Sequence, residues 1–257
     1  MKSPIKDLSR RHKAGAILRE EFIPPGSVVH SFAFYGGEVE FTLAEHNRFV
    51  CAHSNRQMVY EFWNCAMAEP HRLYNIILAD IFKFEGKDMF NVLQENWFKY
   101  RDPYMRSAFF YLLNRCSTTG LISSGELNLK DFNAASLMQL LSFSPPPNFH
   151  LKLDEGGPDI LSNLNDDLGA DYLLIQAANY KRNLLTSGKT VGCEETLIHH
   201  RNLKKKLSGL ESKWIVIYNY HPQVEKLYEN YRRLMINKYG RPTESPTACE
   251  EIVIANF

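Results

Sequence analysis

The sequence predicts an α/β fold with an inserted helical subdomain. Short β-rich stretches alternate with helical stretches at both ends of the chain, the first predicted strand runs into a glycine turn, and a long helical block separates the two ends. Strands that alternate with helices are typical of a parallel sheet whose faces are covered by helices. The helical block is therefore expected to be an insertion into the sheet domain.

The N-terminal part of the sheet domain, residues 1–72, contains the clearest strand–turn–helix pattern. Residues 27–34 are β-rich, follow Pro24-Pro25-Gly26 and end at Tyr35-Gly36-Gly37. A glycine turn directly after a strand indicates a βαβ unit with parallel strands. The elements expected next are a helix that begins within 39–43, a strand at 48–52 and a helix over 55–68.

The rest of the chain divides into the helical insertion and the C-terminal part of the sheet domain. Residues 73–147 have mainly helical spacing, strongest over 105–114, and Pro145-Pro146-Pro147 ends the block. Residues 148–257 return to alternating strands and helices. Strands are predicted at 151–154, 170–178, 214–218 and 250–255, and helices at 159–168, 196–213 and 224–234.

The composition argues against several classes of protein. The 257 residues, 44% hydrophobic and 23% charged, are enough to bury a core without disulfides. The five scattered cysteines lack Cys-x-x-Cys spacing and the histidines match no known ligand set, so we expect free thiols, a reducing compartment and no metal site. No apolar run suits a signal peptide or a membrane span. These features predict a cytoplasmic protein.

The charge distribution leaves nucleic-acid binding open. The formal net charge is only +1, so any affinity for phosphate would need a local basic surface. Two basic clusters exist, one at Arg10, Arg11 and Lys13 and the other over 199–206. Each is either a solvated helix face or such a surface.

Five segments carry a family pattern. They are 11–16 (Arg-His-Lys-Ala-Gly-Ala), 34–39 (Phe-Tyr-Gly-Gly-Glu-Val), 52–55 (Ala-His-Ser-Asn), 102–121 (with Asp-Pro-Tyr-Met-Arg, Tyr-Leu-Leu-Asn-Arg and Gly-Leu) and 250–256 (Glu-Glu-Ile-Val-Ile-Ala-Asn). In this order they resemble the Dam-type DNA adenine-N6 methyltransferases over nearly the whole chain. The resemblance implies a Rossmann-like S-adenosylmethionine-dependent methyltransferase fold, in which residues 73–147 correspond to the DNA-recognition subdomain.

The resemblance also implies a cofactor site, but the site departs from the family pattern. Its positions are Lys13, Phe34, Tyr35, Gly36, Gly37 and His53. Tyr35 and Glu38 interrupt the glycine turn that cradles S-adenosylmethionine, and His53 replaces the acid that binds the ribose hydroxyls. Histidine is a poorer bidentate acceptor than a carboxylate, and a tyrosine could fill the adenosyl pocket. We therefore expect no cofactor, or S-adenosylmethionine if the pocket is open.

The catalytic signature of the family, Asp-Pro-Pro-Tyr at the end of a central strand, is missing. In the ungapped alignment Gln176 stands at the acid and Asn179 at the aromatic, and a shift of one residue puts Ala177 and Tyr180 there. Neither alignment restores the acid together with the proline pair, and the tyrosine that stacks on the flipped base is lost in the first. Gln176, Asn179 and Tyr180 are therefore expected to be degenerate catalytic positions without activity.

DNA recognition of the family's kind is also in doubt. Asn114 and Arg115 lie in a segment that, in the family, packs near the active site, so they either contact DNA or hold the fold together. The segment 125–147, which replaces the family's recognition hairpin, carries one lysine and no arginine. Phosphate contacts alone would position DNA without reading its sequence.

Three hypotheses follow for the function. The first is a catalytically inactive methyltransferase homologue that acts as a binding or assembly protein, with DNA, an active methyltransferase or a phage particle as its partner. The second is an active adenine-specific DNA methyltransferase with a deviant motif. The third is a non-specific DNA-binding protein. Fold alone does not decide among them.

Overall fold

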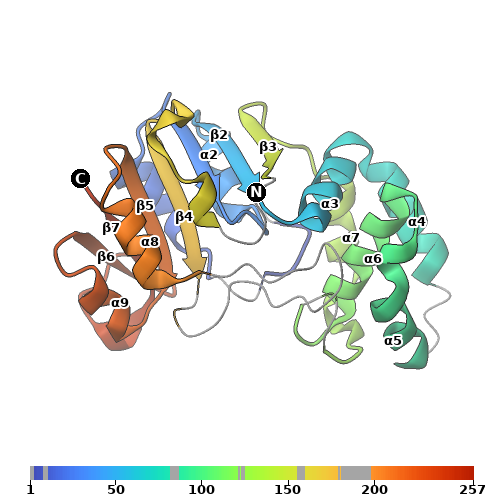
Figure 1. Ribbon diagram of the computed structural model, residues 1–257. Helices are drawn as coiled ribbons and strands as arrows, with labels where there is room; N and C mark the ends of the chain where they lie inside the picture. The colour runs from blue at the N-terminus through green and yellow to red at the C-terminus, as the bar shows by residue number, and fades with distance from the viewer. Residues whose placement is uncertain are drawn as a thin grey trace.

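A seven-stranded sheet and a group of helices beside it make up the molecule (Figure 1). The structure is a computed structural model, and it describes residues 3–7, 11–81, 87–120, 122, 125–154, 160–178, 180 and 198–257. In Figure 1 the sheet lies on the left with α8 and α9, and α4 to α7 lie on the right. Among the described residues, no helix is long and apolar enough to cross a membrane.

The sheet confirms the predicted α/β fold class. Its strands follow the order β3-β2-β1-β4-β5-β7-β6. The first five are parallel, and β7 is antiparallel to both of its neighbours. The bounds are β1 (Val28–Phe32), β2 (Phe49–Ser54), β3 (Phe149–Leu153), β4 (Tyr172–Ala178), β5 (Lys213–Asn219), β6 (Arg232–Asn237) and β7 (Cys249–Ala255). The order reverses between β1 and β4, and ligands of open parallel sheets bind at such a switch point.

Two apolar cores cover the two faces of the sheet, because successive side chains of a strand point to opposite faces. Along β4, Tyr172 and Leu174 belong to the core beneath α1, α2 and α3. Leu173 and Ile175 belong to the core beneath α8 and α9. The helices on these faces are α1 (Ala14–Ile17), η1 (Leu18–Phe22), α2 (Glu38–Glu45), α3 (Gln57–Ala68), α8 (His200–Leu207) and α9 (Pro222–Leu227).

The inserted helices pack around α6 (Pro103–Cys116), whose beginning is encoded locally. Asp102 caps the helix by accepting hydrogen bonds from the backbone N–H groups of Tyr104 and Met105, at 2.7 and 3.1 Å, and Pro103 occupies the first turn. Both features favour a helix start. The other elements of the insertion are α4 (Pro70–Ile81), α5 (Lys87–Asn96), η2 (Trp97–Lys99), η3 (Leu129–Asp131) and α7 (Ala134–Leu141).

An aromatic cluster joins the sheet to the insertion. Trp63 of α3 is fully buried and lies 5.1 to 5.7 Å, between ring centroids, from Phe34, Phe41 and Phe143. Its indole nitrogen donates a 2.7 Å hydrogen bond to the carbonyl of Tyr35. The turn after β1 is thereby packed against the helical part of the molecule.

Three predicted helices are wrong in part. The helix predicted over 224–234 ends at Leu227, and Arg232–Asn237 is the edge strand β6. Val224 and Tyr228 are buried at helical spacing, but beyond them pairing with β7 determines the structure. The helix predicted over 159–168 is two short 3-10 turns, η4 (Ile160–Asn163) and η5 (Asp166–Leu168). The helix predicted over 196–213 ends at Leu207, and Lys213 begins β5, while residues 196 and 197 lie outside the described residues.

Replacing Gly37 by alanine is expected to lower the free energy of unfolding by about 2–3 kcal/mol. Gly37 has a φ of +78°, and a Cβ there would overlap the Phe41 ring and lie 3.1 Å from a ring carbon of Phe34. Gly26 is the matched control, since its φ is +86° and a Cβ would meet nothing within 4 Å. Gly26→Ala should cost only about 1 kcal/mol of backbone strain. Urea denaturation measures both variants, and equal losses of unfolding free energy would mean that the overlap with Phe41 and Phe34 contributes nothing.

Candidate functional site

The positions that the resemblance singles out converge where β1, β2 and β4 end at the switch point. The turn 34–37 follows β1, His53 is the last residue but one of β2, and Gln176 lies near the end of β4. Because β1 pairs with both β2 and β4, the three positions lie on neighbouring strands. Asn179 lies outside the described residues. The fold therefore assembles the region, and the contacts of each side chain decide what it can do.

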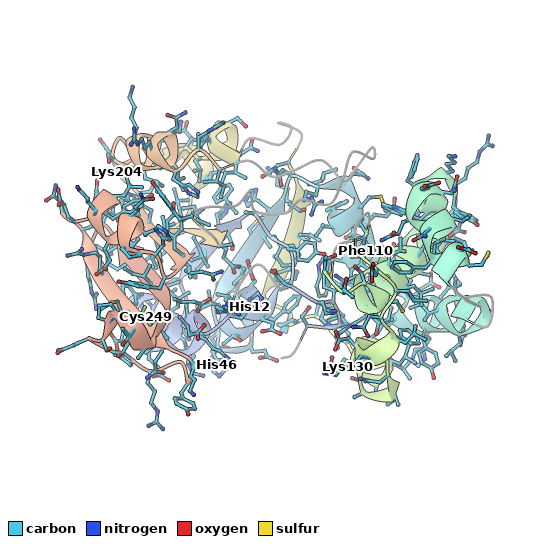
Figure 2. All side chains as sticks on the ribbon, turned by 90° about the horizontal axis from the view of Figure 1, so that it is seen from below. His12, His46, Phe110, Lys130, Lys204 and Cys249 are labelled. Atoms are coloured by element: carbon cyan, nitrogen blue, oxygen red, sulfur yellow. The ribbon has the colours of Figure 1, made fainter. Side chains whose placement is uncertain are left out.

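The glycine turn is packed against the N-terminal segment and the insertion. Tyr35 is buried, and its hydroxyl accepts a 3.2 Å hydrogen bond from the amide nitrogen of Asn114. A Cβ on Gly36 would lie 3.2 Å from Cβ of Asp7 and 3.7 Å from Cε1 of His12. Figure 2 shows His12 between the part that bears Cys249 and the part that bears Phe110. The space that the missing side chain of Gly36 leaves is therefore bordered by Asp7 and His12 of the same chain.

The contact that the structure gives Lys13 at this site is made by its backbone N–H group. Its N–H donates a 2.6 Å hydrogen bond to the Glu251 carboxylate, which also accepts from the N–H groups of Ala14 at 2.8 Å and Arg11 at 3.2 Å. Glu251 comes from β7 and is 2% exposed. Three orphan donors at the start of α1 are therefore satisfied by one carboxylate from the far end of the chain.

His53 is buried, and both of its ring nitrogens have partners. Nδ1 lies 2.8 Å from Oδ1 of Asp154, Nε2 lies 3.0 Å from Nδ1 of His30, and the ring stacks on Phe32 at 4.5 Å. Burial acts to lower the pKa of His53, but hydrogen bonds to Asp154 and Cys51 outweigh it and raise this pKa to about 9. Burial and the neighbouring His53 lower the pKa of His30 to about 4. The pair can therefore share one proton, held mainly by His53.

Gln176, at the position of the catalytic acid, contacts a buried carboxylate. Its amide nitrogen donates a 2.5 Å hydrogen bond to Oε1 of Glu40, which also accepts from the Ser31 hydroxyl at 2.7 Å. The other oxygen of Glu40 has no hydrogen-bond partner among the described residues. The amide of Gln176 is thus held by Glu40 of α2, and Ser31 of β1 in turn donates to the same carboxylate oxygen.

The space beside Gln176 is small. A cavity of about 10 Å³ lies there, and Ala178, Ile217, Asn219 and Glu251 complete its lining. That volume corresponds to about one water molecule. Together with Gln176, these side chains therefore line a space of about the size of one water molecule.

Tyr180, the alternative aromatic position, belongs to a different cluster. Its ring stacks on His200 at 4.7 Å and on His221 at 5.2 Å, between centroids. Between Gln176 and Ala178 the register of β4 against β5 shifts, and Ala178 has a φ of +51°. The ring of Tyr180 therefore packs against two imidazole rings of the same chain.

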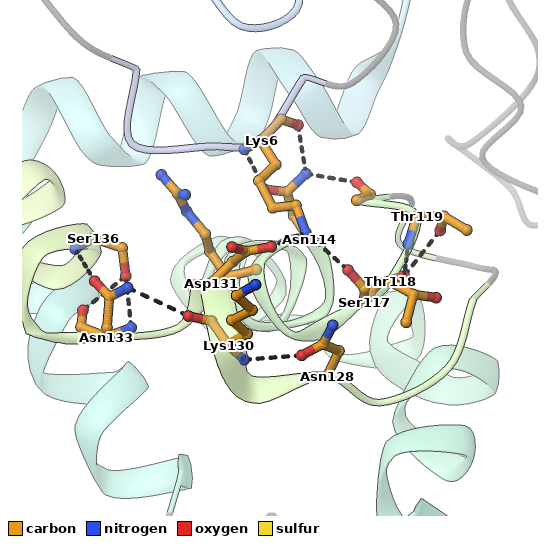
Figure 3. A network of polar contacts seen from close by, with 12 residues as sticks. Lys6, Asn114, Ser117, Thr118, Thr119, Asn128, Lys130, Asp131, Asn133 and Ser136 are labelled. Carbon is orange, nitrogen blue, oxygen red and sulfur yellow. Dashed lines mark hydrogen bonds and ion pairs between the residues drawn. The ribbon is translucent and has the colours of Figure 1, made fainter.

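Asn114 and Arg115 hold the N-terminal segment. Asn114 is fully buried, accepts a 2.6 Å hydrogen bond from the N–H of Lys6 and donates to the carbonyls of Lys6 and Gly120 at 2.9 and 2.7 Å (Figure 3). Arg115 donates to the carbonyl of Pro4 at 2.7 Å. Both side chains thus make contacts within the chain, and their contact with DNA stays a prediction.

Sequence reasoning missed two groups of residues. One is Glu40, whose partner Gln176 lies 136 positions away in the chain. The other is the association of His53, a position that the resemblance had singled out, with His30 and Cys51, whose ligand atoms all lie within 4.8 Å of one another. The alternation Cys51-Ala52-His53 in a strand was the available signal, since residues two apart share a face.

Comparisons with known proteins show little sequence similarity. No family model matches the chain, and no curated protein is significantly similar to it. Among solved structures, a TehB-like SAM-dependent methyltransferase from Corynebacterium glutamicum aligns over 97% of this chain and 88% of its own, at 8% identity and a TM-score of 0.38. The strand order of this chain is itself the Rossmann order with one antiparallel strand added between the last two. The described part of the chain therefore has a Rossmann-like α/β fold.

Proposed function

We propose that this chain is a non-catalytic relative of the DNA adenine methyltransferases that acts as a binding or assembly protein. The observation that carries the proposal is Gln176, which stands at the catalytic acid, is 4% exposed and donates its amide to Glu40. Methyl transfer to adenine needs an acceptor for the target amino group and a pocket for the flipped base. The amide nitrogen of Gln176 is already engaged by Glu40, and the cavity that these described residues line beside it has a volume of about 10 Å³.

The described cofactor positions support the same conclusion, because they do not fit S-adenosylmethionine in the way the resemblance implies. Ribose hydroxyls need an acceptor at the end of β2, and both nitrogens of His53 already have partners, Asp154 and His30. A ligand that approaches Gly36 closely would meet Asp7 and His12. These contacts support a protein that has the Rossmann-like fold but does not bind S-adenosylmethionine at these positions.

A protein fits the remaining features better than DNA as the partner. Asn114 is buried, the net charge is +1, and residues 125–147 carry a single lysine. DNA affinity depends on neutralising phosphates, so residues 125–147 can contribute little to it, and the basic cluster over 199–206 lies on α8, outside that segment. We therefore place a protein, such as a methyltransferase or another component of an assembly, before DNA.

Calorimetric titration with S-adenosylmethionine and with its demethylated product tests the proposal. No heat and no thermal stabilisation are expected at millimolar ligand. In parallel, incubation with adenine-containing DNA and labelled S-adenosylmethionine should transfer no methyl groups, with an active adenine methyltransferase as the positive control. Micromolar binding together with methylated DNA would overturn the proposal. A steep loss of DNA affinity with salt would favour a non-specific DNA-binding protein instead.

A deviant but active methyltransferase is the second candidate, because Glu40 brings a carboxylate to the motif position. If the DNA assay detects transfer, Glu40→Gln should abolish it by removing that charge. Glu38→Gln is the matched control on the same helix, since its side chain is only partly buried and lies outside the Gln176 contact. Transfer that survives Glu40→Gln would rule out this catalytic role for Glu40.

A further inference from the structure

Three metal-binding donors converge on one face of the sheet, away from the motif position of Gln176. They are a ring nitrogen of His30, Sγ of Cys51 and a ring nitrogen of His53, and all lie within 4.8 Å of one another; Nδ1 of His30 and Nε2 of His53 are 3.0 Å apart. Two imidazoles and a thiol are the donor types that zinc prefers in proteins. The described residues thus contain a ligand set that is scattered along the chain.

Strand pairing brings these donors together. In the parallel pair of β1 and β2, His30 lies directly opposite Cys51. Cys51 and His53 are two residues apart on β2, so their side chains point to the same face. A pairing shifted by one residue would send His30 to the opposite face and leave the cluster with two donors.

The neighbours of His53 match the surroundings of a metal-bound histidine. Its Nδ1 lies 2.8 Å from Oδ1 of Asp154, and Asp154 follows β3 on the far side of β2. Metal-bound histidines almost always donate their second ring nitrogen to such a group, which fixes the tautomer and the orientation of the ring. Stacking on Phe32, at 4.5 Å and 18° between planes, holds the same ring from another side.

The distances suit a tetrahedral cation. Zinc–nitrogen bonds of about 2.0–2.1 Å and zinc–sulfur bonds of about 2.3 Å place tetrahedral ligand atoms about 3.3–3.7 Å apart. The nitrogen atoms of His30 and His53 are 3.0 Å apart and would separate by a few tenths of an ångström to admit the ion, whereas the sulfur of Cys51 lies within 4.8 Å of the other ligand atoms and would move closer by rotation of its side chain. His30 and Cys51 are only partly buried, which leaves a path for entry from solvent.

We infer that His30, Cys51 and His53 form a zinc site, with Asp154 as the outer carboxylate that orients His53. Three protein ligands leave a fourth position for water or a small ligand. The ion joins β1 to β2 at the edge where the resemblance implies a ribose. The inference uses no contact of Gln176 or Glu40, and an ion on His53 would replace its His30 contact and leave both ring nitrogens engaged.

Metal titration of the purified full-length protein tests the site. After treatment with a chelator, titration with Zn²⁺ should show one ion per chain and raise the melting temperature, since a ligand that binds only the folded state stabilises it. Co²⁺ should give the intense visible bands of tetrahedral coordination, with a sulfur-to-metal charge-transfer band. Zn²⁺ should also slow alkylation of Cys51, as followed by peptide mass spectrometry.

Variants of the partly buried ligands identify the donors. Cys51→Ser should remove the charge-transfer band, and His30→Ala should weaken Zn²⁺ binding at least about tenfold. Asp154→Asn should weaken binding about 10- to 100-fold and keep the stoichiometry of one ion, because only an outer contact changes. His150→Ala is the matched control. His150 lies directly opposite Cys51 on β3, is exposed and stands outside the cluster.

Three outcomes would overturn the inference. The first is no stoichiometric binding to the folded wild-type protein. The second is binding that Cys51→Ser and His30→Ala leave unchanged, which indicates adventitious surface histidines. The third is alkylation of Cys51 at one rate with and without Zn²⁺, which indicates a hydrogen-bonded thiol–imidazole pair in place of a metal site. Circular dichroism of each variant separates loss of binding from loss of folding.

Discussion

Replacing Asn114 by leucine is expected to lower the free energy of unfolding by about 4 kcal/mol. Leucine has the same number of side-chain heavy atoms with the same branching but is bulkier, so the change removes a fully buried amide that contacts Lys6 through both its oxygen and its nitrogen and adds some crowding. The carbonyl of Gly120 and the hydroxyl of Tyr35 lose a partner as well. Each buried polar group left unpaired costs about 1–3 kcal/mol.

Urea denaturation, with the slope of the transition compared between variants, measures the change. Asn128→Ala is the control, because Asn128 accepts one local hydrogen bond from the N–H of Lys130, and its loss should cost at most about 1 kcal/mol. Asn114→Asp keeps the acceptor for Lys6 and should fall between the two. A loss below about 1 kcal/mol for Asn114→Leu would mean that the N-terminal segment is not held by this contact.

Replacing Glu251 by alanine is expected to lower the free energy of unfolding by about 3 kcal/mol. The carboxylate accepts hydrogen bonds from the backbone N–H groups of Arg11, Lys13 and Ala14, and no alanine side chain can accept any of them. Glu251 is 2% exposed, so water cannot replace it without rearrangement. The start of α1 would then lose its attachment to β7.

The neighbouring residue provides the control for this second prediction. Glu250 forms an ion pair with Arg11 at 3.3 Å, and the two side chains are 39% and 57% exposed. Exposed ion pairs contribute little, so Glu250→Ala should change stability by at most about 0.5 kcal/mol. Hydrogen exchange should show faster exchange of the amides of Lys13 and Ala14 only in Glu251→Ala. Similar losses for both variants would contradict the capping role.

These two contacts have a shared consequence for the candidate site. Asn114 holds Lys6, and Glu251 holds the backbone from Arg11 to Ala14. Between these anchors the chain brings Asp7 and His12 against Gly36. The contacts of Asn114 and Glu251 therefore hold in place the segment that packs against Gly36. If the anchors are weakened in a variant that still folds, S-adenosylmethionine should be tested again for binding.

The sequence by itself determined the local elements and the departures from the family motif. The residues around Tyr35 indicate a strand and a turn, and Asp102 with Pro103 encodes the start of a helix. Gln176 stands where the family that the chain resembles has its acid. Short-range signals of this kind are visible in a single chain because a turn or a helix cap involves residues only a few positions apart.

Only the tertiary structure decided which side chains meet. Strand β6 forms because β7 offers it a partner, although the preceding residues have helical spacing. Glu40 reaches Gln176, and His30 reaches His53, through strand order and register. Register is set by pairing between distant segments, and a shift of one residue would reverse every side chain of a strand. The sequence therefore showed where the chain departs from the motif of the family that it resembles, whereas only the fold showed which donor groups lie together.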